Sequence, residues 1–200
     1  MMEHGTGKAT RSTTSGAAAR RSPALTGHVR LTPIFPWRSP LAEFHTAVEW
    51  NTKGSDSSKQ GRYTAALECY DKALEVDPRY AAAWFDKGVT LGKLKRYDEA
   101  IQCFEQALEN DPKNGEAWIW RGFMLDNLDR YKEAIDCYAR ALKIEPNNAV
   151  AWFSKGIALT NLNRYKEALT CFDRTLEIDP YHPLAKDNRE AALRNINTRR

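Results

Sequence analysis

The sequence repeats itself with a period of 34 residues from Ala47 onward. A repeat of this kind is typical of proteins in which one small unit is stacked on the next, so that each unit packs only against its neighbours. A closed core assembled from distant segments is therefore not expected. Four residue types keep the spacing throughout: Trp50, Trp84, Trp118 and Trp152; Gly54, Gly88, Gly122 and Gly156; Cys69, Cys103, Cys137 and Cys171; Pro78, Pro112, Pro146 and Pro180.

Each unit is predicted to hold two amphipathic helices, as residues 81–114 illustrate. Apolar residues recur at helical spacing over residues 84–94, and they do so again over residues 97–108 after a short polar break. Proline disfavours helical structure in the residue before it, so Pro112 ends the second helix.

Small and large residues are placed as two packed helices require. Gly88 and Ala100 are small where we expect the two helix axes to approach, and Trp84 and Phe104 are large where space remains to be filled. We expect these positions to be buried scaffold, so that replacing one such tryptophan by alanine would cost about 3–5 kcal/mol.

The order of residues in each unit, Trp, Gly, Tyr, Ala, an aromatic residue, Ala and Pro, resembles the tetratricopeptide repeat (TPR). Copies at 47–80, 81–114, 115–148 and 149–182 carry the resemblance. It implies an all-α fold, a right-handed superhelical solenoid of antiparallel helix pairs. In this family the first helices line a concave groove, which usually binds peptides.

The two ends of the array differ from its middle. We expect the first helix to begin early, with Ser39 as N-cap and Pro40 as its first residue, so that the array spans residues 39–182. Residues 183–200 predict a C-terminal capping helix and a basic end. Residues 1–38 lack hydrophobic periodicity and predict a basic, mostly disordered tail; a transit peptide and a misassigned translation start are the alternatives.

The net charge of +4 comes from the N-terminal part of the chain. Residues 1–46 hold six basic and two acidic side chains, whereas residues 47–200 hold 24 of each sign. Balanced charge leaves little net attraction for phosphate groups, so nucleic-acid binding is disfavoured, with RNA binding by helical repeats as a lesser alternative. No apolar run approaches the length of a membrane span, so we expect no membrane partner.

The sequence offers no catalytic or metal-binding constellation. None of the four histidines has a Cys, Ser or carboxylate at a recognisable catalytic spacing, and no Gly-rich phosphate loop is present. The cysteines lie one repeat apart, too far for disulfides, whose Cα atoms must lie within about 7 Å. We expect four free, mostly buried thiols, no metal, no cofactor and no enzymatic activity. Free thiols favour the cytoplasm, with organellar import through the basic tail as the alternative.

The resemblance also places ligand contacts on each first helix, at its second, fifth, sixth, ninth, twelfth and thirteenth positions. Most of these are apolar here, and the Asn that many relatives carry at the ninth position is absent. The Lys, Asn and Arg side chains that clamp the acidic tails of chaperones are absent too, which argues against such a receptor. Trp120 is the strongest candidate contact, whereas Phe85, Ile119 and Phe153 could instead pack between helices. The candidate partner-binding residues are Phe85, Val89, Ile119, Trp120, Phe123, Phe153 and Ile157.

These observations together predict a non-catalytic adaptor or scaffold that binds a peptide or an amphipathic helix of a partner protein in an apolar concave groove. A self-associating structural protein, which would form homo-oligomers, is one alternative. The targeting arm of a multi-component enzyme is another. The pattern does not identify the partner or its pathway.

Overall fold

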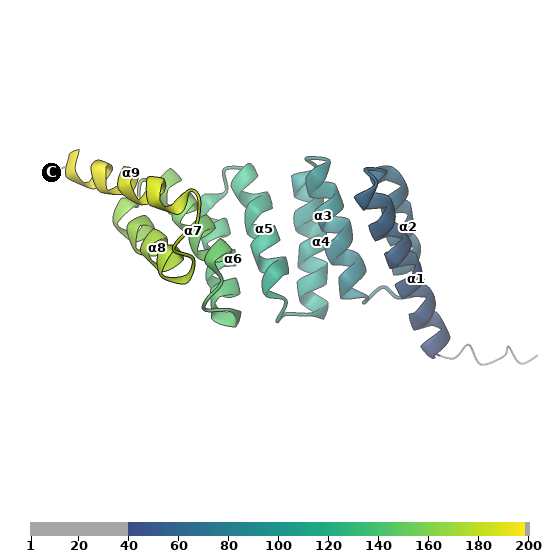
Figure 1. Cartoon of the computed structure of the whole chain (residues 1–200). Coiled ribbons are helices and arrows are strands. Elements are labelled where there is room, and N and C mark those ends of the chain that lie inside the picture. Colours follow the sequence, from purple (N-terminus) through teal and green to yellow (C-terminus); the bar gives the residue numbers. More distant parts are fainter. Residues whose placement is uncertain (1–39, 199–200) are drawn as a thin grey trace, which may run out of the picture. The chain divides into compact units, whose positions relative to one another are not determined.

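A computed structural model describes residues 40–198, with side chains from Thr46 onward. This part of the chain consists of nine α-helices joined by short turns and contains no β-strand (Figure 1). The helices are α1 (Pro40–Lys59), α2 (Tyr63–Val76), α3 (Ala81–Lys93), α4 (Tyr97–Asn110), α5 (Gly115–Asn127), α6 (Tyr131–Ile144), α7 (Ala149–Asn161), α8 (Tyr165–Ile178) and α9 (Ala185–Thr198).

The helices pack as consecutive pairs, and each pair packs on the next (Figure 1). Each of α1, α3, α5 and α7 also contacts the next odd-numbered helix, whereas α2, α4, α6 and α8 make no contact with one another. Helices that approach across repeats lie on the inside of a curved stack, so the odd-numbered helices line its concave face. The predicted all-α solenoid of helix pairs is confirmed.

A glycine in each first helix lets an aromatic ring of the second helix approach its backbone. A Cβ atom added at Gly122 would lie 2.5 Å from a ring carbon of Tyr138, and one at Gly88 would lie 2.9 Å from a ring carbon of Phe104. Both rings are fully buried. Cβ atoms do not approach this closely in well-packed interiors. The prediction that Gly88 is small because the helices approach there is confirmed.

The repeated tryptophans are half-buried, which corrects the expectation that Trp84 lies fully in the core. Its indole Nε1 donates a hydrogen bond to the Pro78 carbonyl oxygen at 2.9 Å, so the ring bridges the turn between two repeats. The Lys87 ammonium lies 5.3 Å from the ring centroid. A ring with a polar partner at one end and a cation on its face belongs at the edge of a core. The same hydrogen bond joins Trp118 to Pro112 and Trp152 to Pro146.

The turn inside each repeat contains one residue in the left-handed conformation, which strains most side chains. Glycine adopts it freely, and Asn and Asp tolerate it better than other residues. The sequence pattern did not reveal this requirement, because only the first repeat has a glycine there. The residues are Gly61 (φ 74°), Lys95 (φ 59°), Asp129 (φ 55°) and Asn163 (φ 59°).

The N-terminal helix α1 begins at Pro40. The predicted N-cap Ser39 and the predicted tail of residues 1–38 lie outside the described residues.

The C-terminal helix α9 caps the array, as predicted, but it begins at Ala185 and not at Pro183. Pro183 and Leu184 form a turn, in which the Leu184 amide donates to Nδ1 of His182 at 3.4 Å. The helix packs on α8, where Arg189 Nε lies 2.5 Å from a carboxylate oxygen of Asp173.

Candidate functional site

The concave face carries the predicted partner-binding residues, and all but one of them are partly exposed. Ile119 is the exception: it is 6% exposed and belongs to the main hydrophobic core. Its side chain is shorter than the phenylalanines at the same position of α3 and α7. It therefore supplies packing and little ligand surface, which agrees with the packing alternative that the sequence left open for this residue. The half-buried residues are Phe85, Val89, Trp120, Phe123, Phe153 and Ile157.

The aromatic side chains of this face are continuous with the core beneath it. Phe85 makes an edge contact with Phe104, with ring centroids 5.8 Å apart, and Phe123 does so with Tyr138 at 5.9 Å. Trp120 in turn meets the ring of Phe123 at 5.8 Å. Rings held from below lose little freedom when a ligand covers them, so the face is preorganised for apolar side chains.

Apolar side chains also lie exposed toward the C-terminal end of the array. Val150 on α7 is 50% exposed and Leu184, at the equivalent position of the next unit, is 54% exposed. The ring of His182 lies 4.4 Å from that of Phe153. Val150 and Leu184 thus expose apolar side chains at equivalent positions of neighbouring units.

Carboxylates accompany the aromatic residues on α3 and α5. Asp86 is half-buried and accepts a hydrogen bond from Nδ2 of Asn51 on α1 at 2.9 Å. The pKa of Asp86 is raised overall, chiefly by burial. The hydrogen bond from Asn51 lowers it in part, and the nearby Glu116 carboxylate adds to the increase. Glu116 accepts a hydrogen bond from Nε1 of Trp120 at 3.2 Å. The face is thus apolar with acidic groups set beside its rings.

A third carboxyl group, that of Asp126, is held by a tyrosine of the second helix. The Tyr138 hydroxyl donates to it at 2.5 Å, and burial raises the pKa of Asp126 to about 6 although the hydrogen bond opposes this. The repeats with Phe104 and Phe172 in place of tyrosine carry no carboxylate at the position of Asp126. Those positions are Gly92 and Thr160.

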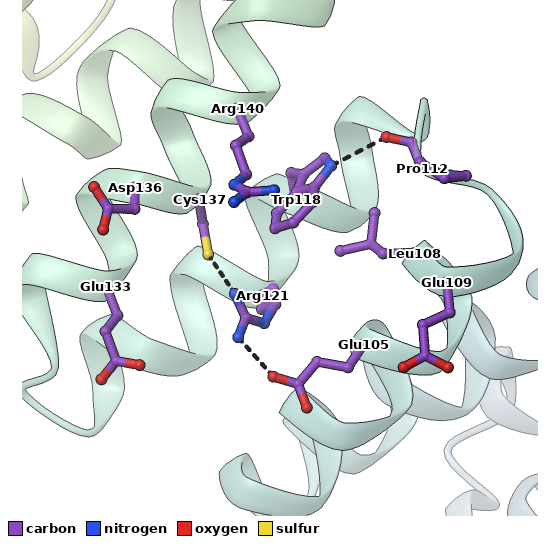
Figure 2. A pocket seen from close by; sticks show the side chains of 10 residues that line it. All are labelled: Glu105, Leu108, Glu109, Pro112, Trp118, Arg121, Glu133, Asp136, Cys137 and Arg140. Carbon is purple, nitrogen blue, oxygen red and sulfur yellow. Dashed lines mark hydrogen bonds and ion pairs between the residues drawn. The ribbon is translucent and has the colours of Figure 1, made fainter.

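Apart from the concave face, a cleft lies on the side of the second helices, between α4, α5 and α6, with a volume of about 550 Å³ (Figure 2). The Arg121 guanidinium crosses it, with Nη2 at 2.6 Å from Glu105 and Nη1 donating to the Cys137 sulfur at 3.1 Å. Arg140 lies over the Trp118 ring, 4.8 Å from its centroid. The groups that line this cleft are therefore largely engaged with one another.

The cleft in Figure 2 does not assemble catalytic chemistry. Burial raises the pKa of Cys137, although Arg121 lowers it, so the thiol stays protonated and is a poor nucleophile. The equivalent space one repeat earlier, beside α3 and α4, is lined by Trp84, Lys87 and Cys103, so the cleft recurs with the repeat. Burial raises the pKa of Cys103 and Cys171 to about 11. All four cysteines are free and buried, as predicted.

Between residues 40 and 198, no three His, Cys, Asp or Glu side chains come together as ligands for a metal ion. No helix in that range combines the length and apolar character needed to cross a bilayer.

Comparisons with known proteins identify the repeat. Family models of the tetratricopeptide repeat match residues 51–114 and 86–149, and residues 149–182. YrrB, a solved structure described as a TPR protein with an unusual peptide-binding site, is 32% identical, with 76% of this chain and 83% of YrrB covered and a TM-score of 0.64. The chain belongs to the tetratricopeptide repeat family.

Other TPR structures share the fold at lower identity. The MamA protein is 21% identical, with 76% of this chain and 89% of MamA covered and a TM-score of 0.68. The first TPR domain of Spaghetti (RPAP3), solved with the HSP90 peptide SRMEEVD, is 24% identical, with 60% of this chain and 96% of that chain covered and a TM-score of 0.58. No curated protein matches the chain.

The sequence pattern of this TPR protein indicates the apolar groups of the concave face but not the acidic ones. Asp86 and Asp126 stand at ligand-contact positions of the family pattern, yet they were not singled out. A usable signal was present: the carboxylate of Asp126 occurs in a repeat that has Tyr138, whereas the second and fourth repeats have phenylalanine there and no carboxylate. The pairing of Asp126 with Tyr138 can be interpreted only from the structure, which shows that the Tyr138 side chain reaches α5.

Proposed function

We propose that this TPR protein is a non-catalytic adaptor that binds a peptide or an amphipathic helix of a partner protein on its concave face. The observation that carries the proposal is the row of half-buried apolar side chains on α3, α5 and α7, held from below by core rings. Exposed apolar surface on a rigid scaffold favours a ligand with apolar side chains. Both matching family models describe a repeat whose known use is interaction, and YrrB is described as peptide-binding.

The proposal excludes the acidic chaperone tail as ligand. RPAP3 was solved with such a peptide, but this chain carries Asp86, Glu116 and Asp126 on its first helices α3 and α5. Carboxylates repel an acidic ligand and offer it no hydrogen-bond donor. The free, buried cysteines are in keeping with the cytoplasm, which we propose as the compartment.

The test is affinity capture from source lysate with the full chain, followed by titration of the captured partner. The variant Trp120→Ala/Val150→Ser removes two partly exposed apolar groups of the concave face. The control Tyr181→Ala/Ile144→Ser removes an aromatic and an aliphatic group that are exposed elsewhere. Circular dichroism establishes that all three proteins are folded.

A partner lost with the first variant and kept with the control supports binding at the concave face. A partner retained equally by both variants contradicts it and moves the interaction to another surface. Capture of the chain alone, with molar mass rising with concentration in light scattering, would favour the self-associating alternative.

A further inference from the structure

The concave face between α1, α3 and α5 has one buried hydrogen-bond acceptor without a donor, together with two carboxylates. Asn51 is 9% exposed, and while its Nδ2 donates to Asp86, its Oδ1 has no partner among the described residues. Asp86 and Glu116 add carboxylate oxygens nearby, and each accepts one hydrogen bond from within the fold. A buried acceptor without a donor is costly, and such groups in native proteins call for an explanation.

Three cations of α1, α3 and α5 pair with carboxylates other than Asp86 and Glu116. Lys87 pairs with Asp71 at 2.6 Å, and Arg121 pairs with Glu105 at 2.6 Å, both on the side of the second helices. Lys59 lowers the pKa of Asp86, but it is exposed and pairs with Asp56 at 3.7 Å. No ion pair within residues 46–198 includes Asp86 or Glu116.

Apolar and aromatic surface adjoins these acceptors. Phe85 precedes Asp86 on α3, and the Trp120 indole is hydrogen-bonded to the Glu116 carboxylate. A cation placed among them would gain the carboxylates and, in part, the face of an indole ring. A lysine side chain brings three donors and an arginine side chain five, whereas an apolar or an ionised acidic side chain brings none.

We infer that the partner segment is basic, and that a lysine or arginine side chain of that segment pairs with Asp86 and Glu116 while its apolar neighbours lie on Phe85, Val89 and Trp120. The inference rests on the proposed function and specifies the chemistry of its ligand. Charge complementarity then selects which apolar segments bind, because an acidic segment would leave like charges facing one another.

A random-peptide display selection against the full chain tests this without knowledge of the natural partner. The expected result is enrichment of peptides that combine apolar residues with lysine or arginine. Enrichment of apolar peptides without basic residues, or of acidic peptides, would overturn the inference.

Titration of the strongest selected peptide then locates the charge contact. Asp86→Asn/Glu116→Gln removes both charges but keeps an oxygen to accept from Asn51 and Trp120, so the fold is preserved. The matched control Glu75→Gln/Asp136→Asn removes two exposed carboxylates of second helices. We expect the first variant to raise Kd about tenfold at low salt and to reduce its salt dependence, and the control to leave both unchanged.

Equal affinity of the wild type and Asp86→Asn/Glu116→Gln overturns the inference. If that peptide is nevertheless lost with Trp120→Ala/Val150→Ser, the proposed concave-face function stands and only its basic specificity falls. If neither variant weakens the selected peptide, both proposals fall together.

Discussion

The hydroxyl of Tyr138 on α6 donates a hydrogen bond to the carboxyl group of Asp126 on α5, with the two oxygens 2.5 Å apart. The Tyr138 ring is fully buried, and the other carboxyl oxygen of Asp126, Oδ1, is buried without a partner in the described part of the chain. A single hydroxyl therefore holds a carboxyl group that has lost much of its hydration. The stability of the third repeat depends on this pair in ways that can be measured.

Replacing the tyrosine should leave the carboxyl group without its donor. We expect Tyr138→Phe to lower the free energy of unfolding by about 1–3 kcal/mol, the range for a buried polar group that loses its partner. Urea denaturation of the wild type and the variant measures it.

The double variant Tyr138→Phe/Asp126→Thr provides the control, because it reproduces the Phe172 and Thr160 pair of the fourth repeat. It should recover part of the loss, since no carboxyl group then needs a donor. A single variant as stable as the wild type, or a double variant less stable than the single one, would contradict this account.

The contribution of Asp126 to stability should increase on acidification. Its pKa is raised from 3.8 to about 6 in the folded protein, so the folded state binds a proton that the unfolded chain releases between these values. Proton uptake by the folded state stabilises it as pH falls from about 7 to about 4. We expect a gain of about 1 kcal/mol, less than the full shift implies because the group is partly exposed.

Asp126→Asn isolates this effect, since asparagine accepts from Tyr138 but does not titrate. Glu99 and Glu133, whose pKa values are lowered by neighbouring arginines, act in the opposite sense but do so equally in both proteins. As pH falls from about 7 to about 4, the free energy of unfolding of the wild type should therefore increase relative to that of Asp126→Asn. Parallel curves would show that the carboxyl group does not titrate in this range.

The close approach of α5 and α6 should not tolerate a methyl group. Gly122→Ala would place a Cβ atom 2.5 Å from the buried Tyr138 ring, so we expect a loss of about 1–3 kcal/mol, typical of overpacking. Gly115→Ala, on the same helix, is the matched control because its Cβ would meet the Glu145 carboxylate at 3.0 Å, the end of a flexible side chain. Thermal denaturation should separate the two, and similar midpoints would contradict the packing described.

The left-handed turn at Lys95 should be improved by glycine. Lys95→Gly removes the strain of a φ of 59°, and we expect a gain of about 0.5–1 kcal/mol after the entropy of the added glycine is counted. Asn163 has the same φ of 59° in the wild type, but asparagine tolerates this conformation better than lysine, so Asn163→Gly should change stability less. The reverse order in chemical denaturation would show that side-chain contacts of Lys95 outweigh its backbone strain.

The pattern of residues predicts much of this fold. The period of 34, the helical spacing of apolar residues within it and the closing prolines predict the helix pairs, because these features act within a few residues or between adjacent units. The small residue at Gly88 and the large one at Phe104 were predicted for the same reason: neighbouring helices of one repeat meet at a known register.

Tertiary packing decided which faces of those helices meet water. Ile119 and Trp120 are adjacent in sequence, yet Ile119 is buried in the core and Trp120 is only partly buried, with its indole hydrogen-bonded to Glu116. Trp84 looked like a core residue, but it lies at the edge because its indole donates to Pro78. Such outcomes depend on how neighbouring helices pack and on which hydrogen bonds join a helix to a turn or to another helix. The environment of the Asp126 carboxyl group, for example, is set by a tyrosine of another helix. The period of the sequence therefore determines the scaffold, and the packing between helices determines the chemistry of its side chains.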